Sequence, residues 1–340
     1  MNLKDFWYIA ATSSELAAGT VLGKKLLDEP LVLFRDAEGK PVAMQDRCLH
    51  RNAKLSAGFV KEGQLVCPYH GWHYGPKGTV THVPSEGPGK PKAERACNPT
   101  YACVEQEGYV YVRLQGNAED GIRPFPIPNY GRKGWHHVRL INFFRNSVIN
   151  CAENFVDIPH TVFVHPSIFR KAEYRKLSAL VRRVGGNVHV EYQNETSNLG
   201  WFSFFLNPKK QPIVHKDNFY LPNATSVEYV FSKHRHFFIT SQSIPISAYE
   251  TLVYTDLTYD YGIWNRITAP LVRWQAQKII DQDIEIIGNQ GDVLKKYGPK
   301  FLNSPADIIH VYIESILEAV NRGEDPRALP EKEKQIEFWV

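Results

Sequence analysis

Two short clusters of metal-binding residue types, Cys48-Leu49-His50 and Cys67-Pro68-Tyr69-His70-Gly71-Trp72, are separated by sixteen residues in the first quarter of the chain. Thiolate and imidazole are strong ligands for transition metals, so these side chains predict a metal centre. A structural Cys2His2 zinc site needs the same residue types, but zinc fingers usually place Cys with Cys and His with His. Here each cluster supplies one Cys and one His. A [2Fe–2S] centre with two Cys on one iron and two His on the other needs this mixed supply, and the spacing favours it.

Short antiparallel strands are expected around both clusters. Alternating apolar residues, with Gly- and Pro-containing turns between them, predict hairpins and single strands. They span residues 31–34 with 41–44, 64–66, 74–83, and 101–106 with 109–114. Such short strands indicate a small antiparallel barrel or sandwich. Both clusters fall where a strand gives way to a loop, so two loops at one end of the module can bring the ligands together.

The pattern Cys-x-His followed by Cys-x-x-His, with Tyr69 and Trp72 beside His70, resembles the Rieske motif. The resemblance implies that Cys48 and Cys67 hold one iron of a [2Fe–2S] cluster, and that His50 and His70 hold the other. Such a centre transfers one electron at a time and offers no place for a substrate. Most of the chain follows it, so a second site that receives the electron is expected.

Composition describes an ordinary globular protein of 340 residues, long enough for two domains of roughly 100–200 residues each. The net charge of +4 is too small to indicate nucleic acid as a partner. No apolar run approaches the roughly 20 residues that span a bilayer, and residues 1–16 do not resemble a secretory signal. Five Cys is an odd number, so Cys97, Cys103 and Cys151 are expected to be free thiols in a reducing cytoplasm.

The run 154–165 contains two histidines, His160 and His165, five residues apart. On an unbroken helix of 3.6 residues per turn they would project about 140° apart. Both can face one metal only if the helix ends or bends between them. Pro159 lies close to where such a break can form, although it can also simply end a helix. Two buried packing histidines are the alternative, but the electron source upstream favours a non-haem iron site with two His and one carboxylate.

The carboxylate is expected in the helical stretch 272–288, which offers Asp281, Asp283 and Glu285. Residues three and four positions apart share a helix face. By this rule Asp283 belongs to an apolar face, whereas Asp281 and Glu285 belong to the polar face. The expected apolar neighbours of Asp283 are Ile279, Ile280, Ile286 and Ile287. A buried carboxylate is costly unless it is paired or binds a metal, so Asp283 is the predicted ligand.

The rest of the second half shows a simple order of elements. Residues 177–261 alternate between strand and loop patterns. A last helix is expected after Ser304, a good N-cap with Pro305 in the first turn, and before Gly323. Its predicted buried stripe comprises Ile309, Tyr312, Ile313, Ile316 and Val320. The Gly- and Pro-rich residues 116–134 are typical of a connection between two domains.

The whole chain resembles the oxygenase (alpha) component of the Rieske non-haem iron oxygenases, and among them the compact group similar to vanillate and dicamba O-demethylases. Besides the Rieske motif, residues 6–11, 154–165 and 274–283 carry this resemblance. It implies an α+β fold, in which an all-β Rieske [2Fe–2S] domain at 1–115 is followed by a linker at 116–134. A catalytic domain with a helix-grip (START-like) antiparallel sheet would then occupy 135–340.

By matching position, His160, His165 and Asp283 are implied to bind a mononuclear non-haem Fe(II). Asp157 matches the acid that, in this family, bridges a Rieske His of one subunit to an iron-ligand His of its neighbour. A capping or ion-pairing role is the alternative. Because Asp157 lies three residues before His160, the two are expected to share a helix face. Asn154 is a candidate for contact with these ligands. The bridge implies a homotrimer, because in this family the two centres of one chain are too far apart for useful electron transfer.

The resemblance implies the terminal oxygenase of a multicomponent system, which uses O2 as co-substrate to hydroxylate or oxidatively demethylate a small organic, aromatic or cyclic substrate. Hydroxylation of an O-methyl or N-methyl carbon would release formaldehyde. No Gly-rich dinucleotide fingerprint follows a strand, so an NAD(P)H-dependent reductase or a ferredoxin is the expected electron donor. Two alternatives stay open: a cis-dihydroxylating dioxygenase of aromatic rings, and a non-catalytic Rieske electron carrier with a ligand-binding domain.

Two further groups of residues are less specific. Lysines in the first third are candidates for docking the reductase, although a solvated basic surface is favoured; they are Lys54, Lys61, Lys77, Lys90 and Lys92. Aromatic residues of the later strands are candidates for an apolar pocket, although core packing is favoured; they are Trp201, Phe202, Phe204, Phe231 and Phe237. His234 and His236 are expected to face solvent or this pocket.

Overall fold

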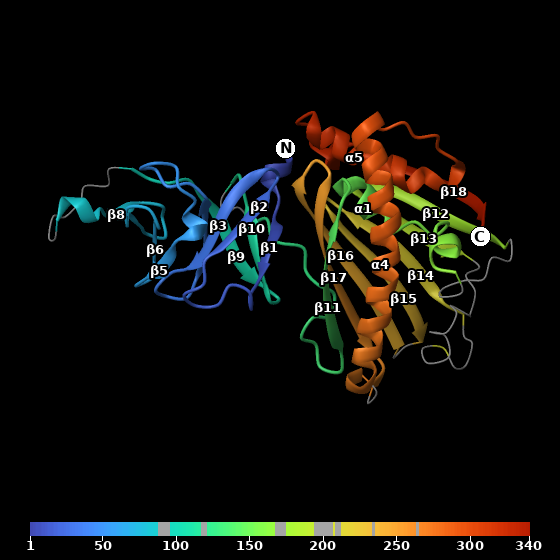
Figure 1. Cartoon of the computed structure of the whole chain (residues 1–340). Coiled ribbons are helices and arrows are strands. Elements are labelled where there is room, and N and C mark those ends of the chain that lie inside the picture. Colours follow the sequence, from blue (N-terminus) through green and yellow to red (C-terminus); the bar gives the residue numbers. More distant parts are fainter. Residues whose placement is uncertain are drawn as a thin grey trace. The chain divides into compact units, whose positions relative to one another are not determined.

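The computed structural model describes residues 1–87, 96–116, 121–166, 175–193, 207, 212–232, 235–262 and 265–340. Several residues named above lie outside the described ones: Lys90, Lys92, Trp201, Phe202, Phe204 and His234. The chain forms two compact units, one comprising Lys4–Phe125 and the other Met1–Leu3 with Pro126–Val340 (Figure 1). The passage between the units falls within residues 116–134, where a connection is expected.

The first unit contains an antiparallel sheet whose strands, in the described residues, follow the order β1-β10-β9-β4-β3-β2. These strands are β1 (Tyr8–Thr12), β10 (Tyr109–Arg113), β9 (Thr100–Gln106), β4 (Pro41–Gln45), β3 (Glu29–Arg35) and β2 (Leu22–Leu26). The β3–β4 and β9–β10 hairpins confirm two hairpins predicted from the sequence. β1 is buried along its whole length, so it lacks the apolar–polar alternation by which a half-buried strand is predicted.

A smaller antiparallel sheet of the same unit borders the two Cys and His clusters: the first lies between β4 and this sheet, and the second lies in a loop within it. In the described residues its order is β5 (Phe59–Lys61), β6 (Gln64–Val66), β7 (His73–Tyr74) and β8 (Val80–His82). β6 confirms a predicted strand, and β7 with β8 confirms a predicted hairpin. The turn of this hairpin requires Gly78, which has φ +79° and whose added Cβ would lie 2.1 Å from the carbonyl oxygen of Asn98.

The second unit is built on one antiparallel sheet, with strands in the order β11-β17-β16-β15-β14-β13-β12-β18 among the described residues. Their bounds are β11 (His136–Phe144), β17 (Glu250–Asp260), β16 (Arg235–Ser247), β15 (Ala224–Ser232), β14 (Val214–Tyr220), β13 (Asn187–Gln193), β12 (Lys176–Val184) and β18 (Lys332–Trp339). The strands from β12 to β17 confirm the strand pattern expected for residues 177–261. Neighbouring strands pair in long antiparallel registers, for example His136 with Tyr259 through Phe144 with Thr251.

The edge strand β18 is not predicted by the sequence pattern. Its first four residues are all polar and exposed, and only Ile336 and Phe338 are buried. It pairs with β12 from Lys176–Trp339 to Arg183–Lys332. Polar and charged side chains are acceptable on an edge strand, where they also discourage pairing with other chains. The strand therefore depends on its partner β12 rather than on its own hydrophobic pattern.

Helices of the second unit are α1 (Val148–Asn154), α2 (Thr161–Val164), α4 (Asn265–Tyr297) and α5 (Ile308–Asn321). Figure 1 shows α4 running along one face of the large sheet. Its buried side chains include Val272, Ile280, Asp283, Ile287 and Leu294, which repeat at helical spacing. Among the described residues, no helix combines the length and the apolar character needed to cross a membrane.

The last helix forms as predicted. Ser304 and Asp307 make a capping box before α5, and Pro305 occupies the first turn. The predicted stripe of Ile309, Tyr312, Ile313, Ile316 and Val320 is buried. It packs against the large sheet with residues such as Leu177, Val190 and Phe219. Gly323, with φ +78°, follows the end of the helix. The two units together confirm the α+β class, with an all-β unit preceding a unit of antiparallel sheet and helices.

Candidate metal centres

Two loops of the first unit hold the first group of candidate ligands. Cys48 and His50 follow β4, and Cys67 and His70 lie between β6 and β7. Each loop is closed by its own backbone. The N–H of Cys48 donates to the carbonyl of Ala53 at 2.8 Å, and the N–H of Cys67 donates to that of Trp72 at 2.9 Å. These bonds hold each Cys at the start of a tight turn, so its His lies close by.

The thiols and the imidazoles of this group differ in exposure. Cys48 and Cys67 are 1% and 2% exposed, whereas His50 is half-buried and His70 is exposed. The rings of His50 and His70 have centroids 4.5 Å apart, and His50 stacks on Trp72 at 4.7 Å. The group therefore has a buried sulfur side and a histidine side that reaches the surface of this unit.

Polar groups surround the two sulfur atoms. The Tyr74 hydroxyl accepts a hydrogen bond from the N–H of Leu49 at 2.9 Å, which leaves its own hydrogen for Cys48 Sγ at 3.2 Å. Burial raises the pKa of the Cys67 thiol, although the N–H groups of Tyr69 and His70 act to lower it. Hydrogen bonds to sulfur are one of the ways in which a protein sets the potential of an iron–sulfur cluster.

The residues present fit a [2Fe–2S] cluster. Nδ1 of His50 is buried, yet no group in the described part of the chain forms a hydrogen bond with it. A buried nitrogen left this way is expected to have a partner, and a metal ion supplies one. Each of the two loops supplies one buried thiol and one imidazole. Two Cys and two His are the ligand set of a mixed Cys2His2 iron–sulfur centre.

The second group of candidate ligands stands on the short helix α2 and on α4. α1 ends at Asn154, and a turn leads to His160, the N-cap of α2. α2 ends at Val164, and His165 leaves the helical conformation with φ −117° and ψ 58°. The helix thus ends between the two histidines. Because they lie five residues apart, both can face one metal only if the helix is broken between them in this way.

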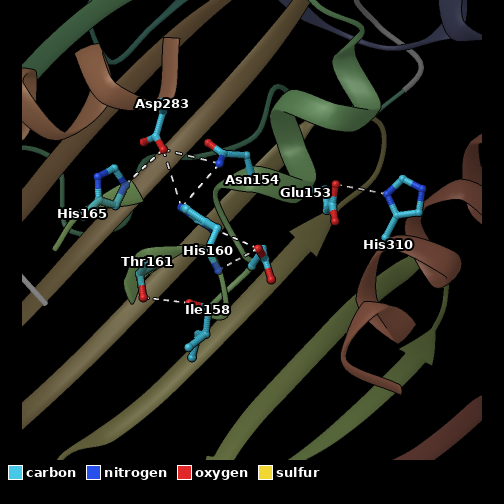
Figure 2. A network of polar contacts seen from close by, with 9 residues as sticks. Glu153, Asn154, Ile158, His160, Thr161, His165, Asp283 and His310 are labelled. Atoms are coloured by element: carbon cyan, nitrogen blue, oxygen red, sulfur yellow. Dashed lines mark hydrogen bonds and ion pairs between the residues drawn. The ribbon is translucent and has the colours of Figure 1, made fainter. Parts of the chain in front are cut away.

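His160, His165 and Asp283 converge on one point (Figure 2). One ligand atom from each lies within 4.8 Å of the others. Nε2 of His165 is 3.1 Å and Nε2 of His160 is 3.6 Å from Oδ1 of Asp283. Burial acts to raise the pKa of Asp283, but hydrogen bonds from both histidines lower it overall. Asp283 is 4% exposed and His165 is 1% exposed, so the group is a buried, charged cluster that fits a metal ion.

Each histidine of this group is also held at its second nitrogen. Nδ1 of His160 lies 3.0 Å from Oδ2 of Asp157, which also accepts from the backbone N–H of His160 at 3.3 Å. Burial opposes protonation, but Asp157 and Asp283 raise the pKa of His160 to about 9. Nδ1 of His165 donates to Oε1 of Gln282 at 2.8 Å. Such contacts leave both Nε2 atoms directed at the same point and orient them as metal ligands.

Two sequence expectations need correction here, and two further contacts complete the site. Asp157 contacts His160 as expected, but the two do not share a helix face, because Asp157 lies in the turn between α1 and α2. Ile286, expected beside Asp283 on the buried face, is 46% exposed. Gln282 was not identified from the sequence, because it belongs to the polar positions of its helix. Its role as the partner of His165 becomes visible only in the tertiary structure. Asn154 Nδ2 donates to Asp283 Oδ1 at 3.5 Å.

These residues open into a cavity of about 1050 Å³, part of which is open to solvent. Its walls come from β14–β17, from α4 and from the α1–α2 region. They are mainly apolar, with Val227, Phe231, Phe237, Leu257, Val272 and Ile280 among the lining residues. Phe231 and Phe237 belong to the hydrophobic core as favoured and also line this cavity. His236 stacks with Phe238 instead and does not line it.

The lysines considered for partner docking have a simple placement. Lys54, Lys61 and Lys77 are exposed on the first unit.

All five Cys of the chain are free of disulfide bonds, and Cys97 is exposed while Cys151 is buried.

Comparison with known proteins links both parts of the chain to one family. Residues 6–104 match the Rieske [2Fe-2S] domain, and residues 148–322 match the vanillate O-demethylase oxygenase C-terminal domain. Chlorophyllide a oxygenase of Chlamydomonas reinhardtii is 33% identical over 173 residues, covering 50% of this chain and 26% of that protein. The vanillate O-demethylase oxygenase subunit of a Pseudomonas species is 30% identical over 187 residues, covering 54% and 51%.

Solved structures agree with the fold. The crystal structure of dicamba monooxygenase bound to dicamba superposes with a TM-score of 0.79 at 21% identity, covering 94% of this chain and 97% of that one. The curated relatives are matched over a smaller share: this chain spans about half of their length or less.

Proposed function

Because the chain belongs to the Rieske non-haem iron oxygenase family, as an oxygenase component, we propose that it is the terminal oxygenase of a multicomponent system. Its cofactors are a Rieske [2Fe–2S] cluster and a mononuclear non-haem iron. In this proposal it uses O2 and electrons from a partner reductase or ferredoxin to hydroxylate or oxidatively demethylate a small aromatic or cyclic substrate. We place this activity in the cytoplasm.

The proposed ligands are those named from the sequence. Cys48 and Cys67 would hold one iron of the cluster, with His50 and His70 on the other. Supporting this are the buried sulfur atoms and Nδ1 of His50, which has no hydrogen-bond partner among the described residues. His160, His165 and Asp283 would hold the mononuclear iron, and the observation that carries the proposal is their convergence at the wall of an apolar cavity. Two His and one carboxylate leave open positions on a non-haem iron.

The chain's own residues would prepare this site for chemistry. When bound, the iron would be the place at which O2 is reduced beside the substrate. Asp157 and Gln282 fix the rings of His160 and His165, so that neither has to turn during the reaction. The charge of Asp283 offsets part of the metal's charge. Apolar walls formed by residues such as Val227, Leu257 and Ile280 exclude bulk water from the reacting atoms.

Asp157 is proposed to connect the two kinds of centre between subunits of a homotrimer. It holds His160 through Oδ2, and its side chain remains 26% exposed, so another chain can reach it. A histidine at the exposed edge of the Rieske group, His50 or His70, would approach it from the neighbouring subunit. Electron transfer would then pass through the hydrogen bonds of one carboxylate.

Iron and acid-labile sulfide content test this proposal directly. The oxygenase predicts about three irons and two sulfides per chain, whereas a non-catalytic Rieske electron carrier predicts about two of each. His160→Ala should lower the iron content to about two and keep the visible spectrum of the cluster. His189→Ala, at a histidine of β13 that contacts Asn218, is the matched control and should leave about three irons. A wild-type content of two irons would contradict the oxygenase.

The reaction itself is tested by a substrate screen. Purified protein with a surrogate reductase should show substrate-dependent consumption of O2 and NADH. Formaldehyde among the products identifies demethylation, and a cis-diol identifies the alternative dihydroxylation of an aromatic ring. Consumption of O2 that does not depend on any organic compound would argue against the proposed function.

A further inference from the structure

Besides the residues of the second metal group, the cavity wall carries a pair of ionisable side chains that contact each other. His215 and Asp217 both belong to β14, whose inward positions alternate with outward ones. Both residues line the cavity, and they are 1% and 2% exposed. β14 lies between β13 and β15 inside the large sheet (Figure 1). The pair therefore stands on a rigid element that faces the same cavity as His160, His165 and Asp283.

The geometry of the pair is fixed from several sides. Nε2 of His215 lies 3.0 Å from Oδ1 of Asp217. The His215 ring is stacked between Tyr192, at 4.5 Å, and Tyr229, at 4.3 Å. Stacking on both faces restricts rotation of the imidazole. The contact with His215 and the position of Asp217 inside the sheet fix the orientation of its carboxyl group.

The surroundings of Asp217 supply few other polar groups. Its cross-strand neighbours are Val190 on β13 and Val227 on β15. His215 takes one carboxylate oxygen, and within the described parts of the chain no group donates to the other, Oδ2. Burying a carboxylate beside valines is costly unless both oxygens find partners. An occupant of the cavity that carries an N–H or O–H group would supply the missing donor.

The polar groups beside Asp217 narrow the choice of occupant further. The described lining contains neither Lys nor Arg, the usual partners of a carboxylate. A carboxylate on the occupant, placed beside Oδ2 of Asp217, would bring two hydrogen-bond acceptors together with no hydrogen between them. A neutral donor such as a phenol O–H or a ring N–H supplies that hydrogen.

We propose that Asp217, positioned by His215, determines substrate specificity by accepting a hydrogen bond from the substrate. The substrate class would be a small, uncharged cyclic molecule with a hydrogen-bond donor on an otherwise apolar body, and carboxylates would be rejected. This inference rests on the proposed function, since it names the substrate class of the same site. The donor fixes one end of the molecule at β14, and the apolar walls hold the rest.

Three compounds that differ at one position test the proposal by binding alone. Calorimetric titration of the full, iron-loaded protein would compare 4-methoxyphenol, 4-methylanisole and 4-methoxybenzoate. A hydrogen bond to a buried carboxylate predicts that the phenol binds about tenfold to a hundredfold more tightly than 4-methylanisole. The benzoate should bind most weakly of the three. Failure of the phenol to bind, or equal or tighter binding of the benzoate, would overturn the proposal.

Substitution of Asp217 supplies the second arm. Asp217→Asn keeps the volume but removes the charge, so the advantage of the phenol over 4-methylanisole should shrink by at least about threefold. Binding of the benzoate should become tighter than in the wild type. Lys216→Gln is the matched control, because Lys216 is the adjacent residue on the opposite face and pairs with Glu191 at 3.1 Å. An unchanged ranking in Asp217→Asn would contradict the proposal.

The binding series is independent of turnover. A protein that shows the predicted ranking but consumes no O2 with any substrate would overturn the proposed function and leave the role of Asp217 in place. Turnover of substrates together with a ranking that favours the benzoate would do the reverse.

Discussion

Nδ1 of His165 donates to Oε1 of Gln282 at 2.8 Å, while Nε2 of the same ring lies 3.1 Å from the carboxylate of Asp283. Gln282 and Asp283 are consecutive residues of α4, so one turn of helix holds both nitrogens of a single imidazole. The arrangement fixes the orientation of the His165 ring. It also ties a histidine beside α2 to a helix more than a hundred residues later in the chain.

Removing this contact should weaken metal binding without removing a ligand. Gln282→Leu leaves Nδ1 of His165 without its acceptor in a buried position, so the affinity for the mononuclear iron should fall by about 10–100-fold. Titration of ferrous iron into metal-depleted protein measures the effect. Asp281→Asn, one residue earlier and exposed, is the control and should bind iron as the wild type does. An unchanged affinity in Gln282→Leu would remove the orienting role from Gln282.

Asp157 is expected to matter for turnover more than for metal content. Asp157→Asn keeps a carbonyl acceptor for Nδ1 of His160 but removes the charge. Turnover should fall by about a hundredfold or more while both metal centres stay occupied. Iron analysis and product formation coupled to NADH consumption measure the two effects separately. Asp292→Asn, at an exposed acid that pairs with Arg145, serves as control. Near-normal coupled product formation in Asp157→Asn would contradict the proposed role of Asp157 as the bridge between subunits.

The hydroxyl of Tyr74 should raise the potential of the iron–sulfur cluster. A hydrogen bond donated to Cys48 Sγ stabilises the reduced cluster, which carries the greater negative charge. Tyr74→Phe removes this bond, so the reduction potential should fall. A redox titration followed by electron paramagnetic resonance gives the value. Tyr69→Phe changes a neighbouring tyrosine that is 65% exposed and should leave the potential where it is. A potential that stays constant or rises in Tyr74→Phe would rule out this role.

The ion pair between His310 of α5 and Glu153 of α1 should make stability depend on pH. Burial acts to lower the pKa of His310, but Glu153, whose carboxylate is 3.2 Å away, raises it above the ordinary value overall. The charged histidine is therefore favoured in the folded state. Its stabilisation is complete below the unfolded pKa of about 6.5 and is lost as the pH rises through the folded pKa.

Thermal unfolding of wild type and His310→Gln at pH 6 and pH 9 checks this expectation. The wild type should be the more stable of the two at pH 6, and the difference should shrink at pH 9. Glu153→Gln should reduce the same pH dependence, because it removes the largest of the contributions that raise the pKa of His310. A difference between wild type and His310→Gln that does not change with pH would show that the ion pair contributes nothing of this kind.

Much of the candidate site could be predicted because its determinants are local. Cys48 with His50, and Cys67 with His70, sit within single tight loops, so residue type and spacing describe them. The burial of Asp283 followed from helical periodicity. The same periodicity was wrong for Ile286, because the buried stripe of α4 runs through Ile280, Asp283 and Ile287 and leaves Ile286 facing solvent. A pattern that is apolar on more than one face cannot say which part of it meets the sheet.

The sequence by itself determines which metal-binding residue types lie close together in the chain. It also indicates where a helix must end, as α2 does between His160 and His165. Partnerships between distant segments belong to the tertiary structure. Gln282 reaches His165 only through the way α4 lies along the sheet, and β18 exists only beside β12. His215 and Asp217 show an inward alternation in their strand, but the sequence does not tell which cavity they face. The physical reason is that these contacts join segments far apart in the chain, so they depend on packing that no local period encodes.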